Sequence, residues 1–505
     1  MSIDYKNKGL TLLKKGQSGI IHAVFSRFGL ILLMLVAQVL ILFSIFQWFQ
    51  AMIPHIFGGT VVLTSVIVVY LLNNRINPTA KITWLIVILI LPVFGVLLFL
   101  YTQSDLGHRV LKEWANKMVS DTRTGIRQDE RVMERLAEEN GGAAALAHYM
   151  GRSGCHPVYD KTAVTYFPLG EEKFEEMLKQ LEAAQHFIFM EYFIVSEGIM
   201  WGRVLEILAR KAAAGVDVRV MYDGTCEFAL LPHDYPKRLR RLGIKCKIFA
   251  PASPFVSTHY NYRDHRKILV IDGQTAFNGG VNLSDEYINQ KMKFGHWKDT
   301  AVMIKGEAVK SFTLMFLQMW GMDGGKVEFD TFLAYPTLEV RDAKGYVIPY
   351  GDRPLDEDQV GERVYMDMLN RALKFAAERG VEVAVLLPGI PDKRIPYALA
   401  KTHYASLLES GVKIFEYTPG FVHAKVFVSD DREAVVGTIN LDYRSLYHHF
   451  ECATYMYGTD CIPQIEADFQ ATLAKCRQVT KETVRHEKWT MKLLGSLMKV
   501  AAPLL

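Results

Sequence analysis

Two short segments of the chain repeat one arrangement of residues that can carry acid–base and nucleophilic chemistry. In each, a histidine stands two positions before a lysine, and an aspartate follows after a mostly apolar stretch. The apolar stretch predicts a buried β-strand, and side chains two positions apart on a strand leave the same face. Each segment should therefore present an imidazole and an ammonium group together. The two copies of this H-x-K-x4-D pattern are His265, Lys267 and Asp272, and His423, Lys425 and Asp430.

A glycine-containing turn that ends in asparagine follows each copy at a similar distance. The first turn reads Gly-Gly-Val-Asn and the second reads Gly-Thr-Ile-Asn. Two such segments brought together would surround one cavity with two imidazoles, two ammonium groups and two amides. This set suits a phosphate diester, because positive charge and N–H donors stabilise its non-bridging oxygens. The residues expected to hold these oxygens are Lys267, Lys425, Asn282 and Asn440.

Displacement at a diester phosphorus needs a nucleophile and a proton donor for the departing alkoxide. A neutral histidine can attack and form a covalent phosphohistidine, which divides one difficult displacement into two easier steps. The other histidine must be protonated, so that it can give its proton to the leaving group and later accept one from the incoming hydroxyl. The pattern therefore predicts that the pKa values of His265 and His423 are moved in opposite directions.

The acidic residues of the pattern lie too far along the strand to attack phosphorus. Asp272 and Asp430 are interpreted as partners that fix the tautomer of an imidazole. Metal binding is a rival use for the histidines, but the adjacent lysines and Arg266 would repel a divalent cation, so we expect no metal. The residues expected to support the site are Gly280, Thr438, Asp299 and Glu451. The histidines expected at the surface or behind the site are His259, His448 and His449.

The two segments belong to a longer internal repeat. The paired histidines lie about 158 residues apart, and glycines that end helices before strands, such as Gly215 and Gly380, recur about 165 residues apart. Agreement between these offsets indicates a duplicated domain rather than two chance matches. Strand and helix signals alternate in the first copy, which predicts an α/β fold with helices on both faces of each sheet.

One strand of the first copy has no visible counterpart in the second. Phe187–Tyr192 reads as a strand before the helix that ends at Gly215, whereas the chain from Val364 runs almost directly from a helix into Gly380. This difference predicts a second sheet that is one strand short, or one that is completed by Val347–Tyr350.

Length and composition favour several domains. The chain has 505 residues, which is too long for one ordinary domain, and its formal net charge of +4 gives no argument for nucleic acid. The six cysteines are scattered, which indicates free thiols in packed positions rather than a disulfide framework. The predicted divisions are a polar segment at 1–27, a membrane region at 28–102, a connector at 103–150, domains at 151–330 and 331–484, and an amphipathic tail at 485–505.

The membrane region consists of three apolar runs, at about 28–49, 51–72 and 82–101. Runs of this length suit a bilayer core of about 30 Å, and no small-residue cleavage site follows the first, which favours an anchor over a signal peptide. We therefore expect an integral, multi-pass protein of the cell membrane. Basic residues favour a cytoplasmic N-terminus. Three spans would put the main domains outside, whereas a re-entrant hairpin near Pro54 would leave two spans and turn them inward.

The tail has apolar residues at helical spacing among basic ones. It can lie on an anionic membrane surface or pack against the main domains, and the sequence leaves both open. The apolar residues are Trp489, Leu493, Leu494, Leu497, Met498 and Val500, and the basic residues are Arg485, Lys488, Lys492 and Lys499.

The duplicated pattern resembles the phospholipase D superfamily, and the chain is similar to bacterial cardiolipin synthases along most of its length. The likeness covers the later apolar runs, both motif regions, Trp297–Thr300 and Asn440–Leu446. It implies two tandem phospholipase D-like α/β/α sandwich domains with pseudo-two-fold symmetry, preceded by transmembrane helices. It also implies transfer of a phosphatidyl group from one phosphatidylglycerol to another, with release of glycerol. The resemblance makes the six residues of the two patterns catalytic, with His265 as nucleophile and His423 as acid and base.

Other functions could use the same residues. They are a phosphatidyl hydrolase, a phosphatidyltransferase with another acceptor alcohol, and a catalytically idle, membrane-anchored binder of anionic lipid. A nuclease is disfavoured by the membrane runs and by the lack of a basic–aromatic groove pattern. Exchange of one phosphodiester for another is roughly isoenergetic and no phosphate-binding loop of the G-x-x-x-x-G-K-[ST] type occurs, so no cofactor is expected. The expected partners are phosphatidylglycerol and membrane lipid, without nucleic acid.

Overall fold

The computed structural model places both patterns and most of the chain between them. The predicted polar segment at 1–27, most of the first apolar run and His259 lie outside the described residues. The described residues are 40, 43, 44, 57–74, 78–103, 106–123, 125–251, 262–325, 327–354, 358–370, 374–378 and 380–501.

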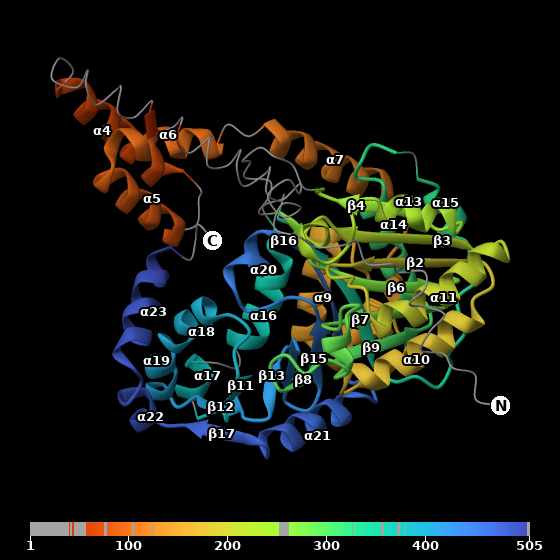
Figure 1. Ribbon diagram of the computed structural model, residues 1–505. Coiled ribbons are helices and arrows are strands. Elements are labelled where there is room, and N and C mark those ends of the chain that lie inside the picture. Colours follow the sequence, from red (N-terminus) through yellow and green to blue (C-terminus); the bar gives the residue numbers. More distant parts are fainter. Residues whose placement is uncertain are drawn as a thin grey trace.

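The first half of the α/β body is built on one sheet of seven strands. Strands β2 and β6 are buried along their whole length, as expected of apolar strands covered on both faces. Helices α10 (Gly170–Ala183) and α11 (Ile199–Ala213) lie along one face of the sheet (Figure 1). The strands in spatial order are β1 (Ala163–Phe167), β9 (Ala301–Lys305), β7 (Thr275–Gly279), β6 (Lys267–Ile271), β2 (Phe187–Tyr192), β3 (Asp217–Asp223) and β4 (Lys245–Phe249).

The second half repeats this plan, but most of its strands form two separate sheets. Within the described part of the chain, no strand joins β14 to β11. The strands of one sheet are β10 (Tyr346–Asp352), β16 (His449–Tyr457), β15 (Glu433–Gly437) and β14 (Val426–Ser429), with β5 (Arg263–Asp264) of the first half also paired to β16. The strands of the other are β11 (Ala384–Pro388), β12 (Lys413–Tyr417) and β17 (Cys476–Val479).

Matching turns show which strand is missing. The N–H of Gly224 after β3 donates to the carbonyl of Phe249 at the end of β4, at 2.7 Å. In the second half, the N–H of Gly389 after β11 donates to the carbonyl of Tyr417 at the end of β12, at 3.0 Å. Strands β11 and β12 therefore correspond to β3 and β4, and the counterpart of β2 is absent from the described residues, as predicted. Val347–Tyr350 does not fill the gap, because it lies in β10 at the far edge.

A shared core holds the two halves together. Helix α14 (Val309–Trp320) lies between the sheets, and its Phe316 stacks on Phe189 of β2 with ring centroids 4.6 Å apart. On the far side of the second sheet, α9 (Gly141–Gly154) and α16 (Val360–Asn370) bury apolar residues against β10 and β16. Much of the predicted connector, which includes α7 (Leu106–Thr122), α8 (Glu130–Glu139) and α9, is thus part of the folded body rather than a spacer.

Three apolar helices project from this body (Figure 1). They are α4 (Phe57–Asn73), α5 (Pro78–Ile90) and α6 (Pro92–Gln103), and Trp84 packs edge-on against Phe99 where they meet. The predicted apolar run at 82–101 is broken at Pro92, where α6 begins. Across the described residues, no helix is both long enough and apolar enough to traverse a bilayer.

The C-terminal helix α23 (Trp489–Ala501) has two faces. One face packs on α18 (Arg394–Lys401) so closely that a Cβ at Gly495 would stand 2.5 Å from the Ala398 carbonyl oxygen. The other face leaves Trp489, Leu493 and Leu497 exposed, by 73%, 50% and 62%. The tail therefore packs on the main body and still presents an apolar stripe.

Candidate active site

Each pattern histidine lies in a short break between two strands. His265 follows β5 and precedes β6, and His423 follows β13 (Gly420–Val422) and precedes β14. The apolar stretch after each lysine forms the predicted strand, but the histidines stand just outside it. The expectation that histidine and lysine stand on one strand is therefore wrong, because the chain changes strand partners at the histidine.

The strand before each histidine pairs with the opposite half of the molecule. Strand β5 runs parallel to β16, and β13 runs parallel to β8 (His296–Lys298). The backbone N–H of His265 donates to the carbonyl of Phe450 at 2.9 Å, and that of His423 donates to the carbonyl of Lys298 at 2.8 Å. Each half thus inserts its histidine beside a strand of the other half.

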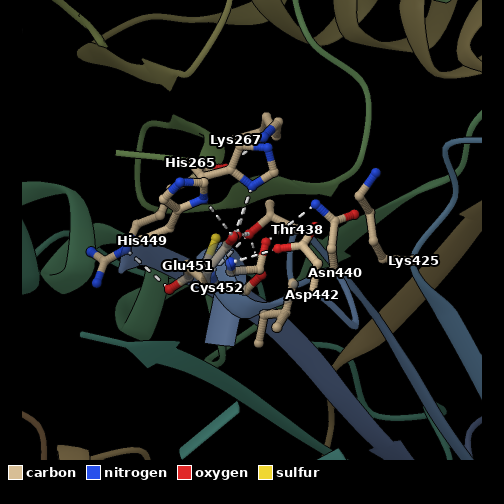
Figure 2. Close-up of polar contacts among 12 residues, drawn as sticks. His265, Lys267, Lys425, Thr438, Asn440, Asp442, His449, Glu451 and Cys452 are labelled. Atoms are coloured by element: carbon tan, nitrogen blue, oxygen red, sulfur yellow. Dashed lines mark hydrogen bonds and ion pairs between the residues drawn. The ribbon is translucent and has the colours of Figure 1, made fainter. Parts of the chain in front are cut away.

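The residue that follows each of these carbonyls is a buried carboxylate. Nδ1 of His265 lies 2.9 and 3.0 Å from the two oxygens of Glu451, and Nδ1 of His423 lies 2.7 Å from Oδ2 of Asp299. A carboxylate accepts a hydrogen bond from Nδ1–H, so it fixes the tautomer that leaves the Nε2 lone pair free. Figure 2 shows the Glu451 carboxylate beneath the His265 ring.

The buried surroundings shift the pKa values of these pairs. Burial, with a contribution from Lys267, lowers the pKa of His265 to about 3. Burial and Lys425 also lower the pKa of His423. Burial opposes ionisation of the carboxyls, but the imidazole contacts outweigh it and hold the pKa values of Glu451 and Asp299 below the usual range. The predicted opposite shifts of the histidines are wrong, because burial acts in the same direction on both.

The charge of each lysine interacts with the carboxylates of both histidine pairs. Each ammonium donates to the carbonyl of the histidine two positions before it, Lys267 to His265 and Lys425 to His423. Burial lowers the pKa of Lys267 to about 7 and that of Lys425 to about 8. Lys425 contributes to the lowered pKa of Lys267, and Lys267 contributes to that of His423, so charges from the two halves act on one another.

Comparisons with known proteins identify the family. The family model described as "Cardiolipin synthase, PLD-like domain" matches residues 177–320 and 364–473, and "Phospholipase_D-nuclease N-terminal" matches 62–101. A cardiolipin synthase of Alkalihalophilus pseudofirmus is 31% identical over 91% of this chain and 95% of its own length. The chain belongs to the cardiolipin synthase family. An uncharacterized protein of Streptococcus mutans serotype c is 55% identical over 87% of this chain and 99% of its own length.

Membership of the cardiolipin synthase family agrees with the fold and the kind of enzyme that the sequence predicts. A solved phosphatidylserine synthase from Haemophilus influenzae shares the fold with a TM-score of 0.51 and 14% identity, covering 68% of this chain and 95% of that one. The predictions of tandem phospholipase D-like domains in a mixed α/β fold, and of an enzyme of the cardiolipin synthase kind, are confirmed.

The asparagines of this cardiolipin synthase relative are engaged in local contacts. Asn282 accepts from the N–H of Ile194 at 3.0 Å and donates to the hydroxyl of Tyr287 at 2.7 Å. Asn440 donates to Oγ of Ser445 at 3.2 Å. These bonds hold the turns after the motifs, so the predicted role of both amides at the phosphate oxygens stays a prediction.

The supporting residues contact the carboxylates directly. A Cβ at Gly280 would stand 2.0 Å from Oδ1 of Asp299, so only glycine leaves room for that carboxylate. At the equivalent position of the other half, the Thr438 hydroxyl donates to Glu451. The four supporting positions therefore form two carboxylate sites, one behind each histidine.

The pattern aspartates do not contact an imidazole, so the interpretation of Asp272 and Asp430 as tautomer-fixing partners is wrong. The Asp272 carboxylate accepts from three backbone N–H groups at 2.7 Å, those of Gln185, His186 and Phe187, where β2 begins. Asp430 is exposed and accepts from its neighbour Ser429 at 3.3 Å. Both aspartates have positive φ, 53° and 52°, and begin the tight turn after the lysine strand.

Two further side chains reach the site. Lys173 of α10 is buried, which lowers its pKa to about 7, and it donates to the Tyr192 hydroxyl at 3.1 Å. In the sequence, Lys173 could be recognised as a lysine among the apolar residues of an amphipathic helix. His449 is buried beside His265, with ring centroids 5.3 Å apart, rather than at the surface.

One cluster could in principle accommodate a cation. Ligand atoms of His265, His449 and Glu451 lie within 4.8 Å of one another. The ammonium groups of Lys267 and Lys425 oppose such occupancy by charge repulsion. The absence of a metal therefore stays a prediction.

Proposed function

We propose that the protein joins two phosphatidylglycerol molecules into cardiolipin and glycerol through a covalent intermediate on His265. The observation that carries the proposal is the crossed support of two imidazoles, each held at Nδ1 by a buried carboxylate of the opposite half, at 2.9 Å for His265 and 2.7 Å for His423. The ammonium groups of Lys267 and Lys425, which interact with both carboxylates, suit the non-bridging oxygens of one diester.

In the first step, Nε2 of His265 attacks phosphorus and the bond from phosphorus to the glycerol oxygen breaks. His423 gives a proton to that oxygen, and glycerol leaves. The low pKa of His265 keeps it neutral and nucleophilic. The negative charge of a bound phosphate diester favours the protonated form of His423, although burial alone disfavours that charged form.

In the second step, the terminal hydroxyl of another phosphatidylglycerol gives its proton to His423 and attacks phosphorus. The phosphorus–nitrogen bond to His265 breaks, and the nitrogen recovers its lone pair. One phosphorus–oxygen bond has replaced another, so no external energy source is needed. Lys267 and Lys425 balance the negative charge that develops on the equatorial oxygens in both steps.

The direct test supplies the full-length protein with phosphatidylglycerol as the sole lipid substrate. Cardiolipin and glycerol should form in equal amounts, and His265→Asn should abolish both. Phosphatidic acid in their place would establish a hydrolase. No turnover by a folded protein would favour the idle lipid binder.

We also propose that the protein is integral to the cell membrane and that α23 rests on its anionic surface. Large apolar side chains such as Val66, Leu89 and Ile90 are exposed on α4 and α5. The stripe of Trp489, Leu493 and Leu497 has exposed basic neighbours and no acidic residue within α23. Hydrogen exchange of the protein reconstituted in vesicles tests the second part: the backbone N–H groups of α23 should exchange more slowly in wild type when the vesicles contain phosphatidylglycerol, and a Leu493→Ser, Leu497→Ser variant should lose this difference. Exchange in α23 of wild type that does not depend on phosphatidylglycerol would remove α23 from the contact.

A further inference from the structure

His449, the first residue of β16, is a buried imidazole whose ring nitrogens have no hydrogen-bond partner among the described residues. Its exposed fraction is 9%. The nearest carboxylate oxygen, Oε1 of Glu451, lies 3.6 Å from Nδ1, which is beyond ordinary hydrogen-bond length. A buried polar group without a partner destabilises the folded state. Folding alone gives no reason to keep an imidazole here.

The mirror position in the other half is Trp297. Each of the two residues stands two positions before the carboxylate that holds a catalytic histidine, Glu451 or Asp299. The His449 ring lies 5.3 Å from that of His265, and the Trp297 ring lies 5.4 Å from that of His423. The fold thus sets an aromatic ring beside each catalytic imidazole. Only on the His265 side does that ring carry two nitrogens.

The surroundings of His449 define what it can bind. Figure 2 shows the His265 and His449 rings both directed toward the Glu451 carboxylate. Nδ1 of His449 lies 3.6 Å from Oε1 of Glu451, beyond hydrogen-bond length, so no contact fixes the tautomer and Nε2 can carry the proton. Phe193 borders the same space, with ring centroids 4.8 Å from His265 and 6.4 Å from His449.

We propose that His449 contacts the substrate, donating a hydrogen bond from Nε2 to a non-bridging oxygen of the phosphodiester as it transfers to His265. The ring lies beside the proposed nucleophile, so it approaches the oxygens that flank the line of attack rather than the leaving group. In the neutral Nε2–H tautomer this nitrogen donates to an oxyanion without any change in the charge of the ring. The ligand class is a phosphate-like oxyanion. The identity of the substrate in this inference rests on the proposed function. The binding test that follows does not depend on that function.

The test measures binding of tungstate, a tetrahedral oxyanion, to the full-length protein by calorimetry after chelator treatment. His449→Phe keeps an aromatic ring and removes the donor, so the dissociation constant should rise about tenfold, as expected for loss of a charged hydrogen bond. His449→Gln keeps an N–H donor and should recover most of the affinity. His448→Phe, at the adjacent and half-buried position, is the matched control and should bind as wild type does.

Three outcomes would overturn the proposal. Unchanged affinity in His449→Phe would show that the imidazole does not contact the oxyanion. Equal losses in the Phe and Gln variants, or losses that follow a lower melting temperature, would reduce His449 to a packing role. Failure of the proposed function would be seen separately, as wild-type protein that binds tungstate but makes no cardiolipin.

Discussion

In the first half of the molecule, the lysine strand β6 lies between β7 and β2 within an unbroken sheet of seven strands, whereas in the second half β14 is an edge strand. The contacts of the two histidine–carboxylate pairs are nevertheless alike. Nδ1 meets a carboxylate of the other half at 2.9 Å in one and 2.7 Å in the other, and each lysine donates to the carbonyl of its histidine. Continuity of the sheet is therefore not what positions the site. The crossed segments β5 with β16, and β13 with β8, position it instead.

The missing strand explains the different surroundings of the two pattern aspartates. Asp272 binds the N–H groups at the start of β2, and the second half lacks the counterpart of β2 among its described residues. Asp430 consequently has no strand to bind and is exposed. One residue of the pattern thus has a structural role in one half and little role in the other.

The largest effect should come from removing the carboxylates. Glu451→Gln and Asp299→Asn keep the side-chain shape but lose the anion that selects the Nδ1–H tautomer, so each should lower the rate of cardiolipin formation about 10³-fold or more. Initial rates with phosphatidylglycerol provide the measurement, and Glu482→Gln, at an exposed position, provides the control. If only one variant lost activity, the two crossed pairs would not be equivalent.

The two aspartates should differ in stability. Asp272→Ala leaves three backbone N–H groups without their acceptor, and we expect the free energy of unfolding to fall by roughly 3–5 kcal/mol. Asp430→Ala should cost less than about 1 kcal/mol, because that side chain is exposed. Denaturant titration of both variants compares them directly. Equal losses would mean that Asp430 has a structural role which the missing strand does not remove.

The lysines predict opposite effects of pH on activity and stability. Activity should fall as pH rises through about 7 to 8, where Lys267 and Lys425 lose their protons. The pKa values of both lysines in the folded state lie below the value of about 10.4 in the unfolded chain. At pH values between them, the unfolded state therefore binds more protons than the folded state. The free energy of unfolding should therefore rise with pH over the same range. Lys425→Arg should lessen the loss of activity at alkaline pH. An unchanged dependence of activity on pH would show that deprotonation of Lys425 does not cause this loss.

Local sequence features predicted much of the fold. The apolar stretches after both lysines form β6 and β14, and the repeat offsets revealed the strand that the second half lacks. The turn at Asp272 and Gly273 was also legible, since Asp-Gly favours the positive φ values of 53° and 67° found there. The Asp-Gly pair therefore indicates a role for Asp272 in the turn.

The partners of the histidines could not be derived in the same way. Glu451 is 186 residues from His265, and Asp299 is 124 residues from His423. Each pairing depends on how the two halves dock, which no local pattern encodes. His449 was expected at the surface or behind the site, because nothing near it in the sequence reveals that β16 brings it beside His265. The pKa shifts likewise follow from burial in the assembled site.

The central claim is that the first histidine bears the phosphatidyl group while the second handles protons. Full-length His423→Asn protein, incubated with phosphatidylglycerol and quenched in alkali to preserve phosphoramidates, can be digested and examined by mass spectrometry. The account predicts a phosphatidyl adduct on the peptide that contains His265, and none on that peptide in a His265→Asn variant. An adduct that instead forms on His423 in the His265→Asn variant, with His265 unmodified in the His423→Asn variant, would contradict the account.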